Sequence, residues 1–229
     1  MAPYNTDSQA NAAEQPDHCD KDNPLLTASK ITCSRGDRML FRDLSFSLDK
    51  GELLHLKGRN GSGKTTLLRT ICGLFLPDSG EIRWDDTATS DLGEEYHRQV
   101  LYLGHHNGIK DDLSALENLR ISAVLDADEV DEPALWSALA DIGLAGYEDL
   151  PTRVLSQGQK RRVALARLLL TSSPLWVLDE PFVALDVSAV ALLQDIIRRH
   201  VAGGGMIIIT THQEVVLATG QIKQLQLGE

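Results

Sequence analysis

One nine-residue segment constrains the fold of this chain more than any other. Residues 58–66 read Gly-Arg-Asn-Gly-Ser-Gly-Lys-Thr-Thr, which matches the pattern G-x-x-x-x-G-K-[ST]. Glycines at these spacings let backbone N–H groups close around a phosphate, and a helix that begins there adds its partial positive charge. A chance match by an ordinary glycine-rich turn is expected in about one chain in a hundred of this length. The segment therefore predicts a phosphate-binding loop between a strand and a helix.

The flanking residues supply that strand and that helix. Residues 52–57 have the pattern of a short strand, and apolar residues recur at helical spacing over 67–72 until Gly73. Within the loop, we expect Lys64 to reach the β- and γ-phosphates of a nucleotide and the Thr65 hydroxyl to ligate Mg²⁺. The residues expected to surround the phosphates are Gly58, Arg59, Asn60, Gly61, Ser62, Gly63, Lys64, Thr65 and Thr66.

The charge of the chain limits its partners. The 229 residues include 22 Lys and Arg against 33 Asp and Glu, a formal net charge of −11. Nucleic acids require a basic surface, so no nucleic-acid partner is expected. Residues 1–24 are acidic and almost free of apolar side chains, which predicts a disordered tail and not a secretory signal. No apolar run is long enough for a membrane span, and the three cysteines show no paired spacing, so we expect a cytosolic chain.

The order of the predicted elements indicates an α/β protein that forms one domain over 25–229. Strands that alternate with helices favour a largely parallel sheet. The helical middle of the chain, about residues 107–167, reads as an insertion into that sheet. The expected strands lie within 25–57 and at 80–84, 175–178 and 206–210, and the expected helices cover 112–146, 156–170 and 188–200.

Two adjacent carboxylates stand at the end of one predicted strand. Residues 175–178 are apolar, and Asp179 and Glu180 follow directly. Ligands of an open α/β sheet bind beyond the carboxyl ends of its strands. Asp179 would therefore face a bound Mg²⁺, and Glu180 would orient or deprotonate the water that attacks a γ-phosphate. Taken alone, the pair is compatible with an ordinary polar turn, but the phosphate loop upstream favours the functional interpretation.

Further motifs follow in a fixed order. Ser156 and Gly158 lie in the run Leu-Ser-Gln-Gly-Gln, ahead of Asp-Glu-Pro at 179–181, the Leu-Asp pair that ends at Asp186, and His212 after the last predicted strand. Together with the phosphate loop, these motifs resemble the nucleotide-binding subunit of ABC transporters from residue 25 onward. The resemblance implies an α/β, P-loop NTPase (RecA-like) core with a parallel sheet, an antiparallel β subdomain and a short helical insertion.

The resemblance also implies a role for each of these positions. Glu180 is the catalytic carboxylate, and His212 contacts the γ-phosphate and holds the attacking water. The alternative interpretation of His212 is a core histidine after a buried strand. Ser156 and Gly158 bind the γ-phosphate that the opposite subunit holds, and Asp186 faces that subunit across the interface. Two copies of the chain are thus expected to sandwich two ATP molecules with their Mg²⁺ ions.

Three positions depart from the family pattern. Gln157 replaces the first glycine of the usual Leu-Ser-Gly-Gly-Gln, whereas Ser156 and Gly158 remain. The family usually stacks an aromatic residue on adenine, but none stands near Arg35, so we expect Arg35 to stack by its guanidinium plane. His105 replaces the usual glutamine before the insertion. We expect it to reach Mg²⁺ through water, because Mg²⁺ prefers oxygen ligands.

A narrower resemblance is carried by residues 102–110, 116–120, 178–186 and 204–213. These segments are similar to the ATP-binding subunit of the bacterial cytochrome c maturation system, often called the haem exporter. The resemblance implies a peripheral ATPase on the cytoplasmic face of the inner membrane, bound to integral membrane subunits. Hydrolysis of ATP by this ATPase is expected to support haem delivery.

The membrane subunits are expected to dock in a groove bordered by residues 105–110 and by the helix that carries Leu116, Leu119 and Ile121. Direct haem binding by His105 and its neighbour is not expected, because nothing apolar surrounds them locally.

Two alternatives remain open. One is the ATPase subunit of another ABC exporter or importer, with the same chemistry and a different cargo. The other is a soluble ABC-type ATPase of translation or DNA maintenance. The translation type carries two nucleotide modules per chain, and the DNA type places a long heptad coil between the phosphate loop and the Leu-Ser motif. Here Lys64 and Ser156 are 92 positions apart without heptads.

Overall fold

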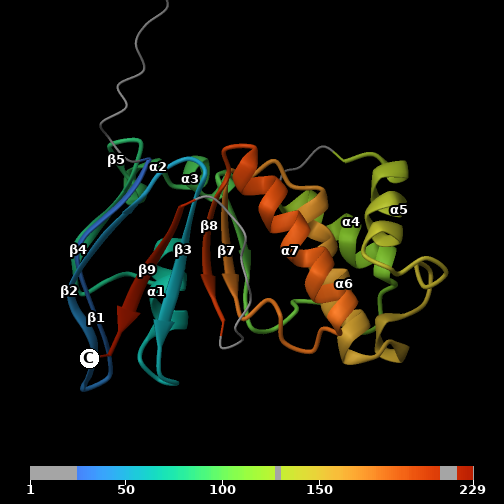
Figure 1. The fold of residues 1–229 in the computed structure, drawn as a ribbon, viewed down its shortest axis with the longest axis horizontal. Coiled ribbons are helices and arrows are strands. Elements are labelled where there is room, and N and C mark those ends of the chain that lie inside the picture. Colours follow the sequence, from blue (N-terminus) through green and yellow to red (C-terminus); the bar gives the residue numbers. More distant parts are fainter. Residues whose placement is uncertain (1–24, 127–129, 212–220, 229) are drawn as a thin grey trace, which may run out of the picture.

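The computed structural model describes residues 25–126, 130–211 and 221–228. Its centre is a parallel sheet of five strands in the order β6-β7-β8-β3-β9 (Figure 1). Asp179 at the end of β7 pairs with Thr210 at the end of β8, so the carboxyl ends of these strands meet at one edge. The strands are β3 (Glu52–Gly58), β6 (Val100–Leu103), β7 (Leu175–Asp179), β8 (Met206–Thr210) and β9 (Gln221–Leu227).

Both faces of this sheet are covered, which explains its sequence. Every residue of β7 and β8 is buried, as expected for parallel strands with a core on each side. Val177 and Ile208 point into a core shared with the helix α1 (Lys64–Ile71). Leu178 and Ile209 point into a core shared with the helix α7 (Val187–Ala202) and the helical insertion. A continuous apolar run is therefore required, and simple alternation would leave one face polar.

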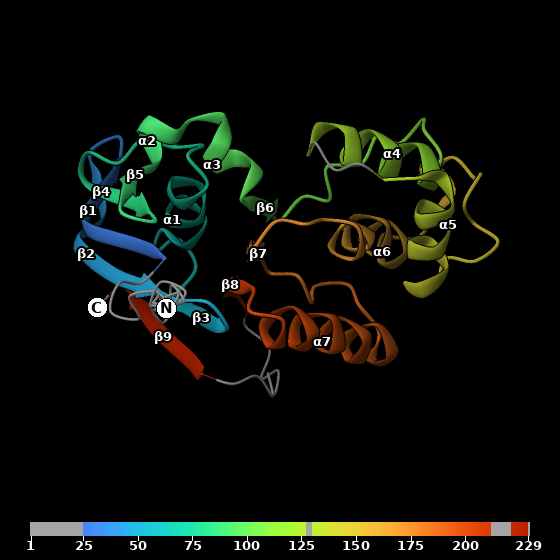
Figure 2. The ribbon, with the colours of Figure 1, turned by 90° about the horizontal axis from the view of Figure 1, so that it is seen from above.

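A four-stranded antiparallel sheet, in the order β2-β1-β4-β5, packs on the other side of α1 (Figure 2). The helix α1 (Lys64–Ile71) buries Leu67, Leu68 and Ile71 between the two sheets. Two short helices lead from this sheet to β6. The bounds are β1 (Leu26–Arg35), β2 (Arg38–Leu48), β4 (Ser79–Trp84), β5 (Thr87–Ala88), α2 (Thr89–Leu92) and α3 (Glu94–Arg98).

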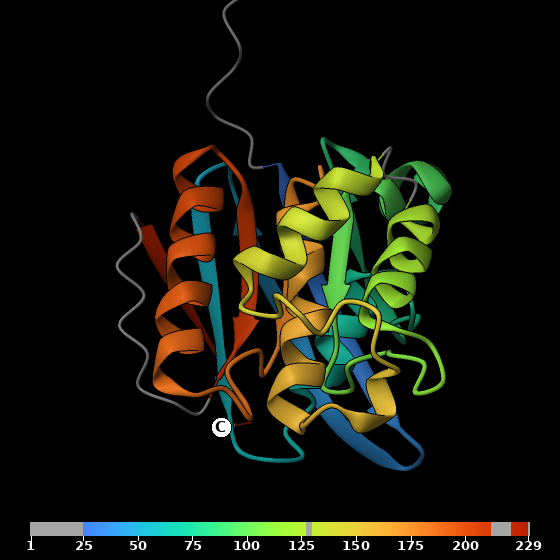
Figure 3. The same cartoon turned by 90° about the vertical axis from the view of Figure 1, so that its right-hand side faces the viewer.

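The helical insertion lies between β6 and β7 and stands on the side away from the antiparallel sheet (Figures 2 and 3). Side-chain caps set where its helices begin: Ser114 and Ser156 each form a capping box, and Asp131 caps a helix with proline in its first turn. Asp186 caps α7 in the same way. The helices are α4 (Ala115–Leu125), α5 (Glu132–Asp141), α6 (Gln157–Ala166) and α7 (Val187–Ala202), with 3-10 turns at Thr152–Val154 and Arg167–Leu169.

The predicted fold class is confirmed, with local differences. Residues 112–146, expected as one helical stretch, form two helices, α4 and α5. The strand β9 and the helices α2 and α3 were not predicted. The expected acidic tail, 1–24, lies outside the described residues. No helix in the described part of the chain combines the length and apolarity needed to cross a bilayer.

Candidate functional site

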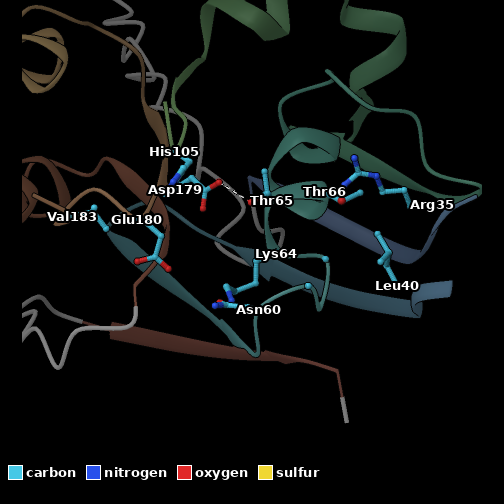
Figure 4. Close-up of a pocket in the computed structure, with 12 residues that line it drawn as sticks. Arg35, Leu40, Asn60, Lys64, Thr65, Thr66, His105, Asp179, Glu180 and Val183 are labelled. Atoms are coloured by element: carbon cyan, nitrogen blue, oxygen red, sulfur yellow. Dashed lines mark hydrogen bonds between the residues drawn. The ribbon is translucent and has the colours of Figure 1, made fainter. Parts of the chain in front are cut away.

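A cleft of about 600 Å³ opens beyond the carboxyl ends of the parallel strands (Figure 4). It brings together residues from the phosphate loop, the end of β7, the segment after β6 and the β1–β2 hairpin. Most of the side chains that the sequence proposed for nucleotide and metal therefore lie in one place. The lining residues are Arg35, Leu40, Asn60, Gly61, Gly63, Lys64, Thr65, Thr66, His105, Asp179, Glu180 and Val183.

The phosphate loop has a backbone that requires its glycines. Gly61 and Gly63 have φ angles of 79° and 99°, which favour glycine. A Cβ at Gly58 would lie 2.6 Å from the Ser62 hydroxyl oxygen. The Lys64 ammonium group donates to the carbonyls of Gly58 and Arg59 at 2.6 and 3.3 Å, which holds the cation over the loop. The loop thus offers backbone donors and one positive charge to a phosphate.

Asp179 is held by hydroxyl groups from two other elements. Its side chain accepts a hydrogen bond from Thr65 Oγ1 at 2.8 Å and another from Thr210 Oγ1 at 2.7 Å. Both Asp179 and Thr210 are buried, with 3% and 0% of their surface exposed. A hydroxyl and a carboxylate are hard oxygen ligands of the kind Mg²⁺ prefers, so the donor set of Thr65 and Asp179 fits this ion. His105 lines the same cleft (Figure 4) and offers a ring nitrogen.

Glu180 directs its carboxylate into the cleft from an unusual backbone position (Figure 4). Its φ angle is 52°, in the left-handed region that non-glycine residues seldom adopt. The Glu180 N–H is fixed by Thr210, through the hydroxyl at 2.9 Å and the carbonyl at 3.2 Å. A strained backbone conformation persists only when the surrounding structure holds it in place. Such residues are frequent at functional sites.

Ser156, Gly158 and Asp186 do not lie in this cleft. They line a separate depression of about 390 Å³, here called the Ser156 hollow, together with Gly143, Tyr147, Gln159, Arg162 and Ala184. The Ser156 hydroxyl accepts from the Gln159 N–H at 3.2 Å as the N-cap of α6. A Cβ at Gly158 would lie only 3.0 Å from the Ala184 carbonyl.

Asp186 makes three kinds of contact in the Ser156 hollow. Its carboxylate accepts from the Ser188 hydroxyl, from the Ala189 N–H and from the Arg162 guanidinium, each within 2.8 Å. These hydrogen bonds, of which the Ser188 bond has the largest effect, lower the pKa of Asp186 to about 2. The Asp186 side chain is nevertheless 64% exposed, so a charged group faces outward here.

Two remaining predictions have different outcomes. His212 lies outside the described residues. Arg35 lines the cleft beside Leu40, where an aromatic residue was missing from the sequence pattern (Figure 4). Sequence reasoning missed Thr210, because its contact with Asp179 depends on β8 lying next to β7, which the sequence does not show.

The docking groove stays a prediction, and the structure shows which face of its expected helix, α4, is exposed. Leu116 and Leu119 are 6% and 1% exposed, because this face of α4 packs into the helical core. The opposite face of α4 presents Ile121, Val124 and Leu125 to solvent, and Leu125 lines a hollow with His97 and Arg98.

Known proteins with similar sequences indicate the family of this chain. The sequence model described as "ABC transporter" fits residues 41–183. The chain belongs to the ABC transporter family. It is 57% identical to the "Cytochrome c biogenesis ATP-binding export protein CcmA" of Nitrosomonas europaea. The alignment of 204 residues covers 89% of this chain and 96% of that protein. As a member of the ABC transporter family it is an ATP-hydrolysing subunit, and the resemblance to the cytochrome c maturation subunit is confirmed.

Solved structures of the ABC transporter family support the fold. A putative ABC transporter ATP-binding protein from Pyrococcus furiosus has a TM-score of 0.75 and 26% identity, covering 87% of this chain and 96% of that one. An ATP-binding cassette solved as a dimer with ADP and phosphate has a TM-score of 0.77 at 23% identity, covering 89% and 97%. The second likeness concerns the fold alone.

Proposed function

We propose that this chain energises an export step in c-type cytochrome biogenesis by hydrolysing Mg-ATP between two copies of itself. The observation that carries the proposal is the 57% identity to a cytochrome c biogenesis export ATPase over 96% of that protein's length. Seven further relatives with the same name match this chain at 44–54% identity. On this family resemblance, we propose that the free energy of ATP hydrolysis drives haem delivery.

The proposed roles in the cleft follow from its donor groups. The loop of Gly58–Thr66 binds the phosphates, with Lys64 as the fixed cation. Thr65 and Asp179 would hold Mg²⁺, which would supply positive charge to the phosphates. Glu180 orients and deprotonates the attacking water. His105 would reach Mg²⁺ through a water molecule. His212 is proposed to contact the γ-phosphate on the family pattern alone.

The nucleotide is proposed to need two copies of the chain. The cleft lacks Ser156 and Gly158, which line the separate Ser156 hollow with an outward-facing Asp186. A second copy that places its Ser156 hollow over the cleft would supply these groups to the γ-phosphate. A cassette with the same fold has been solved as a dimer with ADP and phosphate.

Integral membrane subunits are proposed as further partners, with the chain peripheral on the cytoplasmic face of the inner membrane. Exposed apolar side chains support the proposal: Leu74 and Leu76 after α1 are 61% and 81% exposed, and Val124 and Leu125 on α4 are 72% and 79% exposed. Exposed apolar side chains that gather in short segments in this way are typical of a protein interface.

The test replaces the chromosomal gene of the host bacterium by the Glu180→Gln variant and stains periplasmic proteins for covalently bound haem. The proposal predicts loss of c-type cytochromes, with recovery when the unaltered gene is supplied. Glu81→Gln, an exposed carboxylate on β4, is the matched control and should leave the cytochromes unchanged. Normal cytochromes with Glu180→Gln, in cells that contain the variant protein, would assign the ATPase to another cargo.

A further inference from the structure

A buried arginine lies behind the cleft. Arg161, on α6, has only 4% of its surface exposed. A guanidinium group has five N–H donors, and burial of such a group is costly unless these donors find partners. Burial lowers the pKa of Arg161, and the nearby charges of Asp179 and Glu180 oppose that shift. The structure therefore contains a desolvated cation that must be satisfied by its surroundings.

The acceptors of Arg161 come from two segments of the cleft. From the end of β7, the carbonyls of Asp179, Glu180 and Pro181 accept at 3.4, 2.9 and 3.3 Å. From the segment after β6, the Gly104 carbonyl and the Asn107 side chain accept at 3.2 and 3.1 Å. One side chain on α6 thus ties together the residues around Glu180 and those around His105.

The contact with Glu180 bears on its strained backbone. Arg161 holds the carbonyl of Glu180, while Thr210 holds its N–H at 2.9 Å. Both ends of this left-handed residue are therefore fixed, which is how a structure maintains a conformation that the chain alone disfavours. The carboxylate direction of Glu180 depends on this backbone, and small displacements of a catalytic group have large effects on rate.

Two other arginines of the same region behave differently. Arg162 pairs with the Asp186 carboxylate, and Arg167 pairs with Asp126 through a bidentate contact. These are ordinary ion pairs. Arg161 instead uses its whole guanidinium on main-chain carbonyls and one amide, so its fork shape matters more than its charge.

We infer that Arg161 is a positioning residue for ATP hydrolysis, which holds Glu180 and the segment of His105 in a fixed relation to the helix that begins at Ser156. The inference rests on the proposed roles of Glu180 and His105. Loss of Arg161 would let the Glu180 backbone relax, so water would be activated poorly. ATP binding would persist, because Arg161 does not touch the phosphate loop.

The test compares Arg161→Lys with Arg167→Lys in the full chain. Lysine keeps the charge but cannot span both segments with its single nitrogen. We expect Arg161→Lys to lower kcat at least about tenfold with KM for ATP within about twofold of the unaltered chain. Arg167→Lys should lower the thermal midpoint and leave kcat unchanged. A kcat for Arg161→Lys equal to that of Arg167→Lys would overturn the inference.

A double variant distinguishes positioning from a general structural effect. If Arg161 acts through Glu180, Arg161→Lys should slow hydrolysis no further in a Glu180→Gln chain, whereas independent effects would multiply. Multiplying effects would overturn the inference. A Glu180→Gln chain with normal turnover would instead contradict the proposed role of Glu180, which separates the two failures.

Asn107→Ala is the second variant, in case Arg161→Lys does not fold. It removes one acceptor at the cleft and leaves Arg161 in place. We expect kcat to fall about two- to fivefold and the thermal midpoint to fall slightly, because one donor of the buried Arg161 loses its acceptor. An unchanged kcat would contradict the tie between the two segments.

Discussion

The cleft and the Ser156 hollow hold their polar groups in opposite ways. In the cleft, Asp179 is buried and fixed by hydroxyls from two other elements of the same chain. In the Ser156 hollow, the Asp186 side chain is 64% exposed and fixed mainly by its own helix start and by Arg162. The polar groups of the cleft are therefore held by the same chain, whereas the Ser156 hollow presents its charged group to solvent. One chain thus carries the two unlike regions from which we propose that two copies build a site.

The largest expected effect falls on the cleft. Glu180→Gln should bind ATP but hydrolyse it at least about a hundredfold more slowly, because a positioned general base is lost. Since ATP then persists between two copies, the variant should remain as a closed dimer. Single-turnover assays and size-exclusion runs with and without ATP measure both effects. Normal turnover would place the catalytic base elsewhere and break the assignment of the cleft.

A smaller effect tests the internal support of the cleft. Thr210→Val removes the hydroxyl that bonds Asp179 and the Glu180 N–H, so hydrolysis should fall about tenfold. The free energy of unfolding should fall by about 1–3 kcal/mol, because buried groups lose their partner. Denaturant titration measures this change. Thr87→Val, an exposed position on β5, is the control and should alter neither quantity; equal effects of both variants would remove Thr210 from the account.

Acidification should separate the two regions. Burial, the largest cause, lowers the pKa of His55 on β3, near the cleft. Its contribution to stability is present above the unfolded value of about 6.5 and is lost as the pH falls through the lowered folded value. Asp186, with a pKa of about 2, keeps its charge over this range. Denaturant titrations between pH 7 and 5 should show a smaller loss of unfolding free energy for His55→Gln than for the unaltered chain. Equal losses in the two chains would contradict the assignment to His55.

The smallest expected effect concerns the base of the nucleotide. Arg35 stands at the cleft in place of an aromatic residue. Stacking by a partly exposed cation contributes about 0.5–1 kcal/mol, so Arg35→Ala should weaken ATP binding only a few-fold. Arg35→Tyr should restore or improve the affinity. Equal dissociation constants for all three chains, measured by calorimetry, would show that this side chain does not touch the base.

Local patterns predicted the cleft well. The phosphate loop and the two carboxylates at 179–180 are contiguous in the sequence, and each sits at the end of a recognisable strand. The cap at Ser156 was also identifiable, because a cap acts on residues only three positions away. Such features depend on near neighbours in the chain, which is why sequence alone was sufficient for them.

Features that depend on distant pairing could not be predicted. Arg161 reads as one more charge on a basic helix, and only the packed structure surrounds it with carbonyls. The supporting role of Thr210 requires β8 to lie beside β7. In the strand β9, the adjacent polar residues Lys223 and Gln224 interrupt the alternation, and the strand is fixed at the sheet edge by its pairing with β3. The buried face of α4 likewise depends on which helices pack against it.

The central claim is that the cleft of one copy and the Ser156 hollow of another form one site. It is tested most directly by mixing two inactive chains, Glu180→Gln and Ser156→Arg, before ATP is added. In a mixed dimer, the intact cleft of the Ser156→Arg chain meets the intact hollow of the Glu180→Gln chain. Random pairing should then restore about a quarter of the unaltered activity, if the sites work independently. A mixture no more active than the two variants measured separately would contradict the claim.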